Sequence, residues 1–187
     1  MDIQFNAALV LIDMQNGINH PKLGRRNNRY AELQMLRLLL VWRATDRPVI
    51  HVRHFSRSPS SVFWPEQSGV DYQPEFLPVV GESELQKQTP DAFCGTSLER
   101  YLRTHSITQV IIVGVVTNNS VESTARSGGN LGFEVVVAHD ACFTFDQADF
   151  FGNLHTAEEV HAMSLGNLHG EYATVVSTGE VLDALER

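Results

Sequence analysis

V-I-I-V-G-V-V-T-N-N-S-V-E-S-T-A-R, residues 110–126, is the stretch that decides the fold of this chain. It begins as an apolar, β-branched run, which is typical of a strand buried inside a parallel sheet. Gly114 interrupts the run, and residues 117–119 then offer side chains that commonly cap a helix N-terminus. Unpaired N–H groups and the positive end of the helix dipole converge at such a junction. Ser120 lies there, so we expect it at the centre of a site.

The size and composition of the chain fit one α/β domain spanning residues 1–187. Hydrophobic residues make up 43% of the chain, charged residues 19%, and the net charge is −8. This length allows a sheet covered on both faces. An acidic surface attracts neither nucleic acid nor anionic membranes, so we expect neither as a partner. The sequence shows no basic, apolar leader and no run long enough to span a bilayer, which predicts a cytoplasmic protein.

Apolar runs and helical patterns alternate along the whole sequence. Strands are predicted at 7–12, 48–52, 85–87, 109–113, 134–138 and 174–176, and helices at 29–44, 97–104, from 120 to about 131, 156–168 and 179–185. Strands that alternate with helices predict a mainly parallel, doubly wound sheet.

Two segments indicate contacts beyond this basic plan. The predicted helix 29–44 has an apolar face wider than one core stripe requires, which predicts packing against another subunit in a homodimer or homotetramer. Residues 55–81 mix prolines and glycines with aromatic residues and show no periodicity. A loop of this length in a compact domain is usually a lid or a pocket wall.

Three polar residues follow predicted strands whose ends should meet at one edge of the sheet. They are Asp13, Lys87 and Ser120. Ligands bind beyond the carboxyl ends of the strands in such sheets. Each residue also has an ordinary structural explanation, because aspartate and serine often cap helices or turns and lysine is usually a solvated surface charge. Alone, none of the three specifies a reaction.

Their local sequences are more specific. L-V-L-I-D-M-Q-N (9–16), K-Q-T-P-D-A-F-C-G-T-S-L (87–98), G-V-V-T-N-N-S-V-E-S-T-A-R (114–126) and G-N-L-G-F-E-V-V-V-A-H-D-A (129–141) together resemble the isochorismatase-like hydrolases, also called cysteine hydrolases. The resemblance covers essentially the whole chain. It implies a three-layer α/β fold with a six-stranded, mostly parallel sheet. It also implies a hydrolase of a small metabolite, acting on an amide C–N bond or a vinyl ether.

The same resemblance implies roles for individual residues. Asp13 would act as acid or base, Lys87 as electrostatic stabiliser, and Ser120 would hold the nucleophile position. A non-proline cis peptide is implied at Val115–Val116. We further expect the substrate or oxyanion region to include Gln15, Val116, Thr117, Asn119, His54, Trp64 and Phe143.

The chain departs from the amidases of the family at the nucleophile, where they carry cysteine and this sequence has Ser120. A thiol has a pKa of ~8.5, which a helix N-terminus and a cation can bring to neutrality. A serine hydroxyl starts several units higher, at about 1.4 kcal/mol per unit, so it needs a strong base such as Asp13 or a neutral Lys87. In the isochorismatase branch an aspartate instead protonates a vinyl ether, and Ser120 would then position water or substrate.

Several alternatives therefore stay open. Ser120 is either the native residue or an engineered replacement of cysteine. The chain could also be a catalytically impaired member that serves as a small-molecule binding or interaction protein. A nucleotide-binding domain is disfavoured, because the turn after residue 12 lacks both glycine-rich phosphate motifs.

Neither a metal nor a cofactor is predicted. The histidines show no H-x-x-x-H pair, and the Asp/His metal motif of nicotinamidases has no match here. Cys94 and Cys142 form no C-x-x-C pair and are expected to be inert thiols. The aromatic side chains suggest a partly apolar substrate, with candidate pocket residues Phe63, Trp64, Phe143, Phe145, Phe150 and Phe151, although core packing would explain these aromatic residues equally well.

Overall fold

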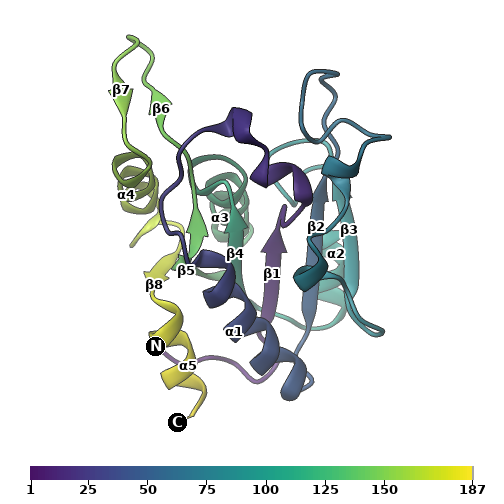
Figure 1. The fold of residues 1–187 in the computed structure, drawn as a ribbon. Helices are drawn as coiled ribbons and strands as arrows, with labels where there is room; N and C mark the ends of the chain where they lie inside the picture. Colours follow the sequence, from purple (N-terminus) through teal and green to yellow (C-terminus); the bar gives the residue numbers. More distant parts are fainter. Residues whose placement is uncertain (187) are drawn as a thin grey trace.

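The computed structural model describes residues 1–186, which form a parallel sheet between two layers of helices (Figure 1). Its six strands have the order β3-β2-β1-β4-β5-β8, and every neighbouring pair is parallel. The strands are β1 (Ala8–Ile12), β2 (Val49–His54), β3 (Ser83–Lys87), β4 (Gln109–Val115), β5 (Glu134–Phe143) and β8 (Thr174–Val176). The predicted three-layer, six-stranded fold is confirmed, and the sheet is parallel throughout.

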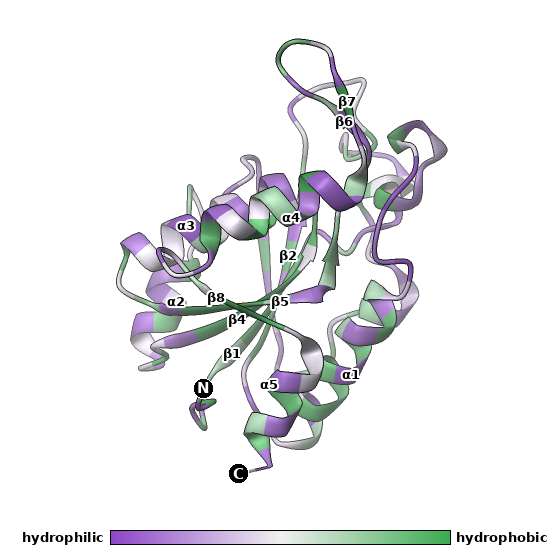
Figure 2. Ribbon diagram, turned by 90° about the vertical axis from the view of Figure 1, so that its left-hand side faces the viewer, coloured by the Kyte–Doolittle hydropathy of each residue, from purple (hydrophilic) through white to green (hydrophobic). Residues whose placement is uncertain are grey.

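Helices cover both faces of this sheet. The helices are α1 (Ala31–Ala44), α2 (Leu98–Thr104), α3 (Glu122–Asn130), α4 (Ala157–Leu168) and α5 (Thr178–Leu185). Figure 2 shows α2, α3 and α4 on one side of the sheet and α1 and α5 on the other. Alternate residues of β1 point to the two faces of the sheet. Leu9 and Leu11 join the apolar cluster that contains α1, whereas Val10 and Ile12 join the apolar cluster on the opposite face.

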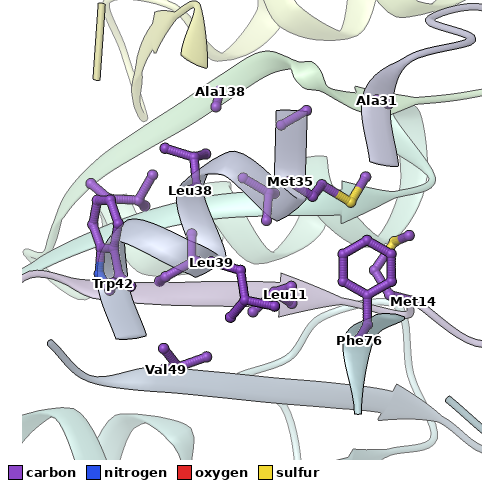
Figure 3. Close-up of a cluster of buried hydrophobic side chains, with 14 of the residues drawn as sticks. Leu11, Met14, Ala31, Met35, Leu38, Leu39, Trp42, Val49, Phe76 and Ala138 are labelled. Atoms are coloured by element: carbon purple, nitrogen blue, oxygen red, sulfur yellow. The ribbon is translucent and has the colours of Figure 1, made fainter. Parts of the chain in front are cut away.

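Helix α1 packs on the sheet through a continuous buried face (Figure 3). Leu38, Leu39 and Trp42 are completely buried there. The indole N–H of Trp42 donates to the carbonyl of Ala7 at 2.9 Å, which satisfies the one polar group of that side chain. Burying a leucine fully contributes about 1.5–3 kcal/mol. Leu36 is partly buried against the same cluster, whereas Leu33 and Leu40, 57% and 64% exposed, lie on the outer side of the helix.

Strand β5 is longer than predicted. Its pairing with β4 shifts register after Ile112, so that Cys142 and Phe143 pair with Gly114 and Val115. The apolar pattern is interrupted at residues 139–140, where the strand bulges, and the prediction therefore stopped at residue 138.

A short hairpin was also not predicted. Strands β6 (Gln147–Ala148) and β7 (Leu154–His155) pair antiparallel and stand away from the sheet above α4 (Figure 1). Two-residue strands carry too few positions to show an alternating pattern. The remaining connections include the short turns η1 (Asn16–Asn19), η2 (Pro21–Leu23), η3 (Ser68–Val70), η4 (Pro74–Phe76) and η5 (Thr117–Val121).

Within residues 1–186, no helix has the length and apolarity needed to cross a membrane.

Candidate active site

The strand order reverses between β1 and β4, and the loops after these two strands diverge there. Gly114 allows β4 to lie close against β1: a Cβ atom at this position would stand 2.2 Å from the carbonyl oxygen of Ile12. Its φ of 118° is also one that other residues rarely adopt. Asp13, the first residue after β1, has the unusual φ of 55°. Strained backbone of this kind is concentrated at functional sites.

The turn after β4 carries Ser120. The Val115–Val116 peptide bond is cis, as the family resemblance implied. Residues Thr117–Val121 then form a π-helical turn, and α3 begins directly after it. The amides of Asn119 and Val121 both donate to the carbonyl of Val116, at 3.0 and 3.2 Å. These bonds fix the turn that holds Ser120 at the edge of the sheet.

Asp13, Lys87 and Ser120 form one buried cluster, although they are distant in the sequence. The ammonium of Lys87, at the end of β3, donates to Asp13 Oδ2 at 2.8 Å and to Ser120 Oγ at 3.1 Å. It also donates to the carbonyl of Thr89 at 3.2 Å. Lys87 therefore links the carboxylate to the serine hydroxyl and uses its three protons in doing so.

The carboxyl group of Asp13 has an unusual environment. Burial raises its pKa, and the positive charge of Lys87 only partly opposes this effect. Its second oxygen, Oδ1, is buried without a hydrogen-bond partner among the described residues. A buried polar atom without a partner costs free energy, so its persistence is typical of a group that meets a ligand. Asp13 can therefore carry a proton at a higher pH than an ordinary aspartate.

A cavity of about 450 Å³ opens beside this cluster. This volume suits a small molecule. Asp13 and Ser120 line it together with Val116 and Asn119, two further predicted site residues. His54 and Phe63 line the same cavity, their rings in an edge-to-face contact at 5.9 Å. Burial and then Lys87 lower the pKa of His54, so the imidazole is neutral, and its Nδ1 has no partner within residues 1–186.

Four predicted residues lie outside the cavity wall. Gln15 is buried and holds the backbone of His54 through two bonds, at 3.0 and 2.7 Å, so it supports the wall from behind. Thr117 is buried and its hydroxyl lies 2.9 Å from Nδ1 of His161. Phe143 belongs to the core under Arg26, whose guanidinium lies 3.4 Å above the ring. Trp64 lies at the surface, 36% exposed.

The remaining aromatic predictions also need correction. Phe145 packs against Phe143 at the edge of the core. Phe150 and Phe151 were wrong as pocket residues, because they extend from the β6–β7 hairpin into solvent. Their apolar character suggested a pocket, but the hairpin that carries them left no trace in the sequence pattern.

The sequence interpretation did not name the polar residues of the loop that borders the cavity. Ser56, Arg57, Ser58 and Ser61 lie along it, followed by Gln88 and Pro90 after β3. The signal was present as S-R-S-P-S-S, residues 56–61, inside the loop expected to form a pocket wall. Arg57 contributes a positive charge there, and its Nε donates to Gln88 at 3.1 Å.

Neither cysteine resembles a nucleophile. Cys142 is buried, and burial raises the pKa of its thiol to about 12. Cys94 is exposed and lies outside the cavity wall. In the part of the chain that the structure describes, no three His, Cys, Asp or Glu side chains are grouped so as to hold a metal ion.

Comparison with known proteins gives matches over nearly the whole chain. The isochorismatase domain family matches residues 7–180. The isochorismatase family protein YrdC of Bacillus subtilis (strain 168) is 34% identical over 176 residues, which is 94% of each chain. Nicotinamidase 3 of Arabidopsis thaliana is 29% identical, over 96% of this chain and 88% of its own.

A solved structure extends this agreement to three dimensions. A protein of Chromobacterium violaceum ATCC 12472, described as a hydrolase of the isochorismatase family, superposes with a TM-score of 0.96 at 45% identity. The match covers all of this chain and 97% of that one. The fold and the relatives thus define a hydrolase built on a three-layer fold with a parallel six-stranded sheet. The chain belongs to the isochorismatase family.

Proposed function

We propose that this hydrolase cleaves a vinyl ether in a small metabolite, with Asp13 as the proton donor. The observation that carries the proposal is the state of the Asp13 carboxyl group. Its pKa is raised by burial, and its Oδ1 faces no partner among residues 1–186, beside a cavity of about 450 Å³. General acids work best when their pKa lies near the operating pH. A raised carboxyl pKa moves Asp13 in that direction.

The reaction needs one proton and one water molecule. Asp13 protonates the terminal carbon of the vinyl ether, which leaves a cation shared between the ether oxygen and its carbon. Water adds to that carbon and returns a proton to the Asp13 carboxylate. The resulting hemiketal then breaks its C–O bond, and its hydroxyl proton passes to the departing alcohol oxygen. The products are a ketone and an alcohol, and Asp13 is regenerated.

Lys87 and Ser120 support this sequence. Because Lys87 lies 2.8 Å from Asp13, its charge stabilises the carboxylate that forms when Asp13 gives its proton to carbon. Ser120 receives a hydrogen bond from Lys87 at 3.1 Å, so its own hydroxyl proton can be donated to Asp13, to water or to substrate. In this role serine needs no alkoxide, which the same surroundings could not populate at neutral pH.

Amide hydrolysis is the second candidate, and the similarity to a nicotinamidase favours it. Here Ser120 would attack the carbonyl carbon while Asp13, as carboxylate, accepted the hydroxyl proton. The raised pKa of Asp13 makes it a better base than an ordinary aspartate, although less of it is ionised. This candidate requires Ser120 as a covalent nucleophile.

The isotope content of the product separates the two reactions. We expect the protein to hydrolyse isochorismate in D₂O and to place one deuterium in the methyl group of the released ketone at each turnover. Proton transfer from Asp13 to carbon requires this label, whereas amide hydrolysis puts none on carbon. Turnover of amides without any turnover of vinyl ethers would overturn the proposal. No turnover of either class would favour the binding-protein alternative.

Ser120 provides the matched variants. We expect Ser120→Ala to slow vinyl ether hydrolysis by about tenfold, the value of one hydrogen bond near a charged group. If serine were the nucleophile, the same change would remove the activity. Ser120→Cys restores the nucleophile of the amidases, and strong amidase activity in that variant alone would indicate a site built for a thiol.

A further inference from the structure

Two polar side chains of α4 contact the turn that carries Ser120. Helix α4 lies on the same side of the sheet as α3, which follows that turn (Figure 2). His161 and Ser164 are three residues apart on α4, so they share one face of the helix. Both are buried, at 8% and 2% exposed, and both contact Thr117, the first residue of the turn. One helix thus brings two buried polar groups to the start of the turn.

The hydroxyl group of Thr117 depends on one of these contacts. Thr117 is completely buried, and its Oγ1 lies 2.9 Å from Nδ1 of His161. This hydroxyl has no other hydrogen-bond partner within residues 1–186. A buried hydroxyl that loses its partner costs free energy, which favours any movement of the turn that exposes it. His161 therefore decides whether Thr117 stays in this position.

The ring of His161 has a defined tautomer. Burial, and then the neighbouring His139, lower its pKa to about 4, so the ring is neutral and carries one N–H. Nε2 lies 3.4 Å from the amide nitrogen of Asn28, but the two protons of that amide go to the carbonyls of His139 and Cys142, at 2.9 and 2.7 Å. A hydrogen bond of the ring with the His139 backbone opposes the shift, as expected of an N–H next to a carbonyl oxygen. The proton is therefore on Nε2, and Nδ1 accepts from the hydroxyl of Thr117.

Ser164 fixes the backbone at the same place. Its hydroxyl donates to Glu122 Oε2 at 2.6 Å and lies 3.1 Å from the carbonyl oxygen of Thr117. Glu122 is the first residue of α3, and its other carboxylate oxygen accepts from Arg126. Ser164 thus anchors the backbone on both sides of the turn, whereas the side chain of Thr117 is held by His161 alone.

We propose that His161 is a positioning residue for the reaction, which accepts a hydrogen bond from Thr117 and thereby fixes the turn that presents Ser120. This inference rests on the proposed function only in taking Ser120 as part of the reacting site. Val116 and Asn119, on either side of Thr117, line the active-site cavity, whereas His161 does not. Reaction rates fall by about 10² when a reacting group is misplaced by about 1 Å, so a small movement of this turn is sufficient to slow the reaction.

Two amide side chains separate the two nitrogens of the ring. His161→Asn puts an oxygen near the position of Nδ1, where it can still accept from Thr117. His161→Gln reaches the position of Nε2 but leaves the Thr117 hydroxyl without a partner. The carbonyl of His139 keeps its bond from Asn28 in both variants.

We expect kcat on isochorismate to fall by about 10- to 100-fold in His161→Gln and by less than about threefold in His161→Asn. KM should stay within about twofold in both variants, because His161 does not line the cavity. A role in packing alone predicts the opposite order, since asparagine leaves the larger gap. The proposal is overturned if His161→Asn loses as much activity as His161→Gln.

Thr117→Val removes the same hydrogen bond from its other partner while it keeps the shape of the side chain. We expect kcat to fall about tenfold or more in this variant, and the double variant Thr117→Val/His161→Gln should be no slower than the slower single variant, because one bond is lost in all three. Thermal melts check that each variant is folded. Full activity in a folded Thr117→Val protein would contradict the proposal.

Measurements without substrate keep this test separate from the test of the proposed reaction. In ¹⁵N spectra of the histidine rings we expect His161 to be protonated at Nε2 and unprotonated at Nδ1, and a proton on Nδ1 would overturn the inference. The amide resonances of Asn119 and Ser120 should shift in His161→Gln and stay near their wild-type positions in His161→Asn. If the protein hydrolyses amides in place of vinyl ethers, the same two variants are compared on the amide, and the expected order is unchanged.

Discussion

Two carboxylates occur in similar company at opposite ends of the sheet. Asp13, at the carboxyl end, contacts Lys87 and lies near His54. Glu82, just before β3 at the amino end, contacts Arg43 and His51. Both have side chains that are almost completely buried, 5% and 7% exposed. Burial and the types of partner alone would give the two carboxylates the same role.

Their hydrogen bonds separate them. Oε1 of Glu82 accepts a hydrogen bond from Arg43 at 2.7 Å. Oε2 accepts hydrogen bonds from Arg43 and from the amide of Val79, both at 2.9 Å. The same oxygen lies 2.8 Å from Nε2 of His51. Burial raises the pKa of Glu82, but these bonds outweigh it and lower the pKa to about 2. Asp13 has one ion pair and a raised pKa, and its Oδ1 has no hydrogen-bond partner among the described residues. The structural carboxylate has hydrogen-bond partners on both of its oxygens, whereas the carboxylate proposed to react has one oxygen without a partner among the described residues.

The largest expected effect is on activity at the unsatisfied carboxylate. Asp13→Asn keeps the size of the side chain but cannot donate the catalytic proton, so we expect kcat to fall by about 10²–10⁴, the usual contribution of a general acid. Steady-state kinetics on isochorismate measure this effect. Glu82→Gln is the matched control, and its kcat should stay within about twofold of wild type. If kcat fell equally in Asp13→Asn and Glu82→Gln, the two carboxylates would not differ in their importance for catalysis.

The second prediction concerns Lys87. Lys87→Met removes the charge that stabilises the Asp13 carboxylate, and we expect kcat to fall by about 10²-fold. As a proton donor, Asp13 is active below its pKa, so the wild-type rate should fall as pH rises through that raised pKa. The charge of Lys87 opposes the upward shift that burial causes in the pKa of Asp13, so this pKa should increase further when Lys87 is removed. The descending limb of the pH–rate profile should therefore move to higher pH in Lys87→Met. A rate that increases with pH in the wild type would instead indicate a base.

The third prediction concerns the stability supplied by the saturated carboxylate. Glu82→Gln leaves His51 and Arg43 without their partner charge, and we expect a loss of about 2 kcal/mol in the free energy of unfolding. For a chain of this size the melting temperature should fall by about 4–8 °C.

Its pH dependence follows from the lowered pKa of Glu82. The stabilisation is present above the unfolded value of 4.5 and is lost as pH falls toward about 2. The difference in stability between the two proteins should shrink over that window in denaturant titrations. A difference that persisted at pH 2 would show that the ionised form of Glu82 is not what stabilises the fold.

The sequence was sufficient for the fold and for the three central residues. The apolar run before Gly114 predicted β4, and the polar residues after three strands predicted which side chains would meet. These features depend on local apolar patterns and on the alternation of strands with helices along the chain, both of which can be read from the sequence. The family resemblance added the cis bond at Val115–Val116.

The sequence could not separate supporting residues from lining residues. Gln15 and Thr117 were expected at the substrate, but Gln15 bonds the backbone of His54 and Thr117 contacts His161. Which way a side chain points after a strand depends on backbone angles such as the φ of 55° at Asp13, and no composition pattern encodes them. The exposed Phe150 could not be told from a pocket aromatic for the same reason.

The smallest expected effect is at His54, the second unsatisfied group of the cavity. Its Nδ1 is buried without a partner in the described part of the chain, and burial keeps the ring neutral by lowering its pKa. His54→Phe preserves the ring and its contact with Phe63 but removes one hydrogen bond to the substrate, worth about 1 kcal/mol. We expect KM to rise about fivefold while kcat changes by less than about twofold. His105→Phe, an exposed position at the end of α2, should leave both constants unchanged. A fall in kcat with unchanged KM would instead give His54 a part in the proton transfer and leave Asp13 as only one of two reactive groups.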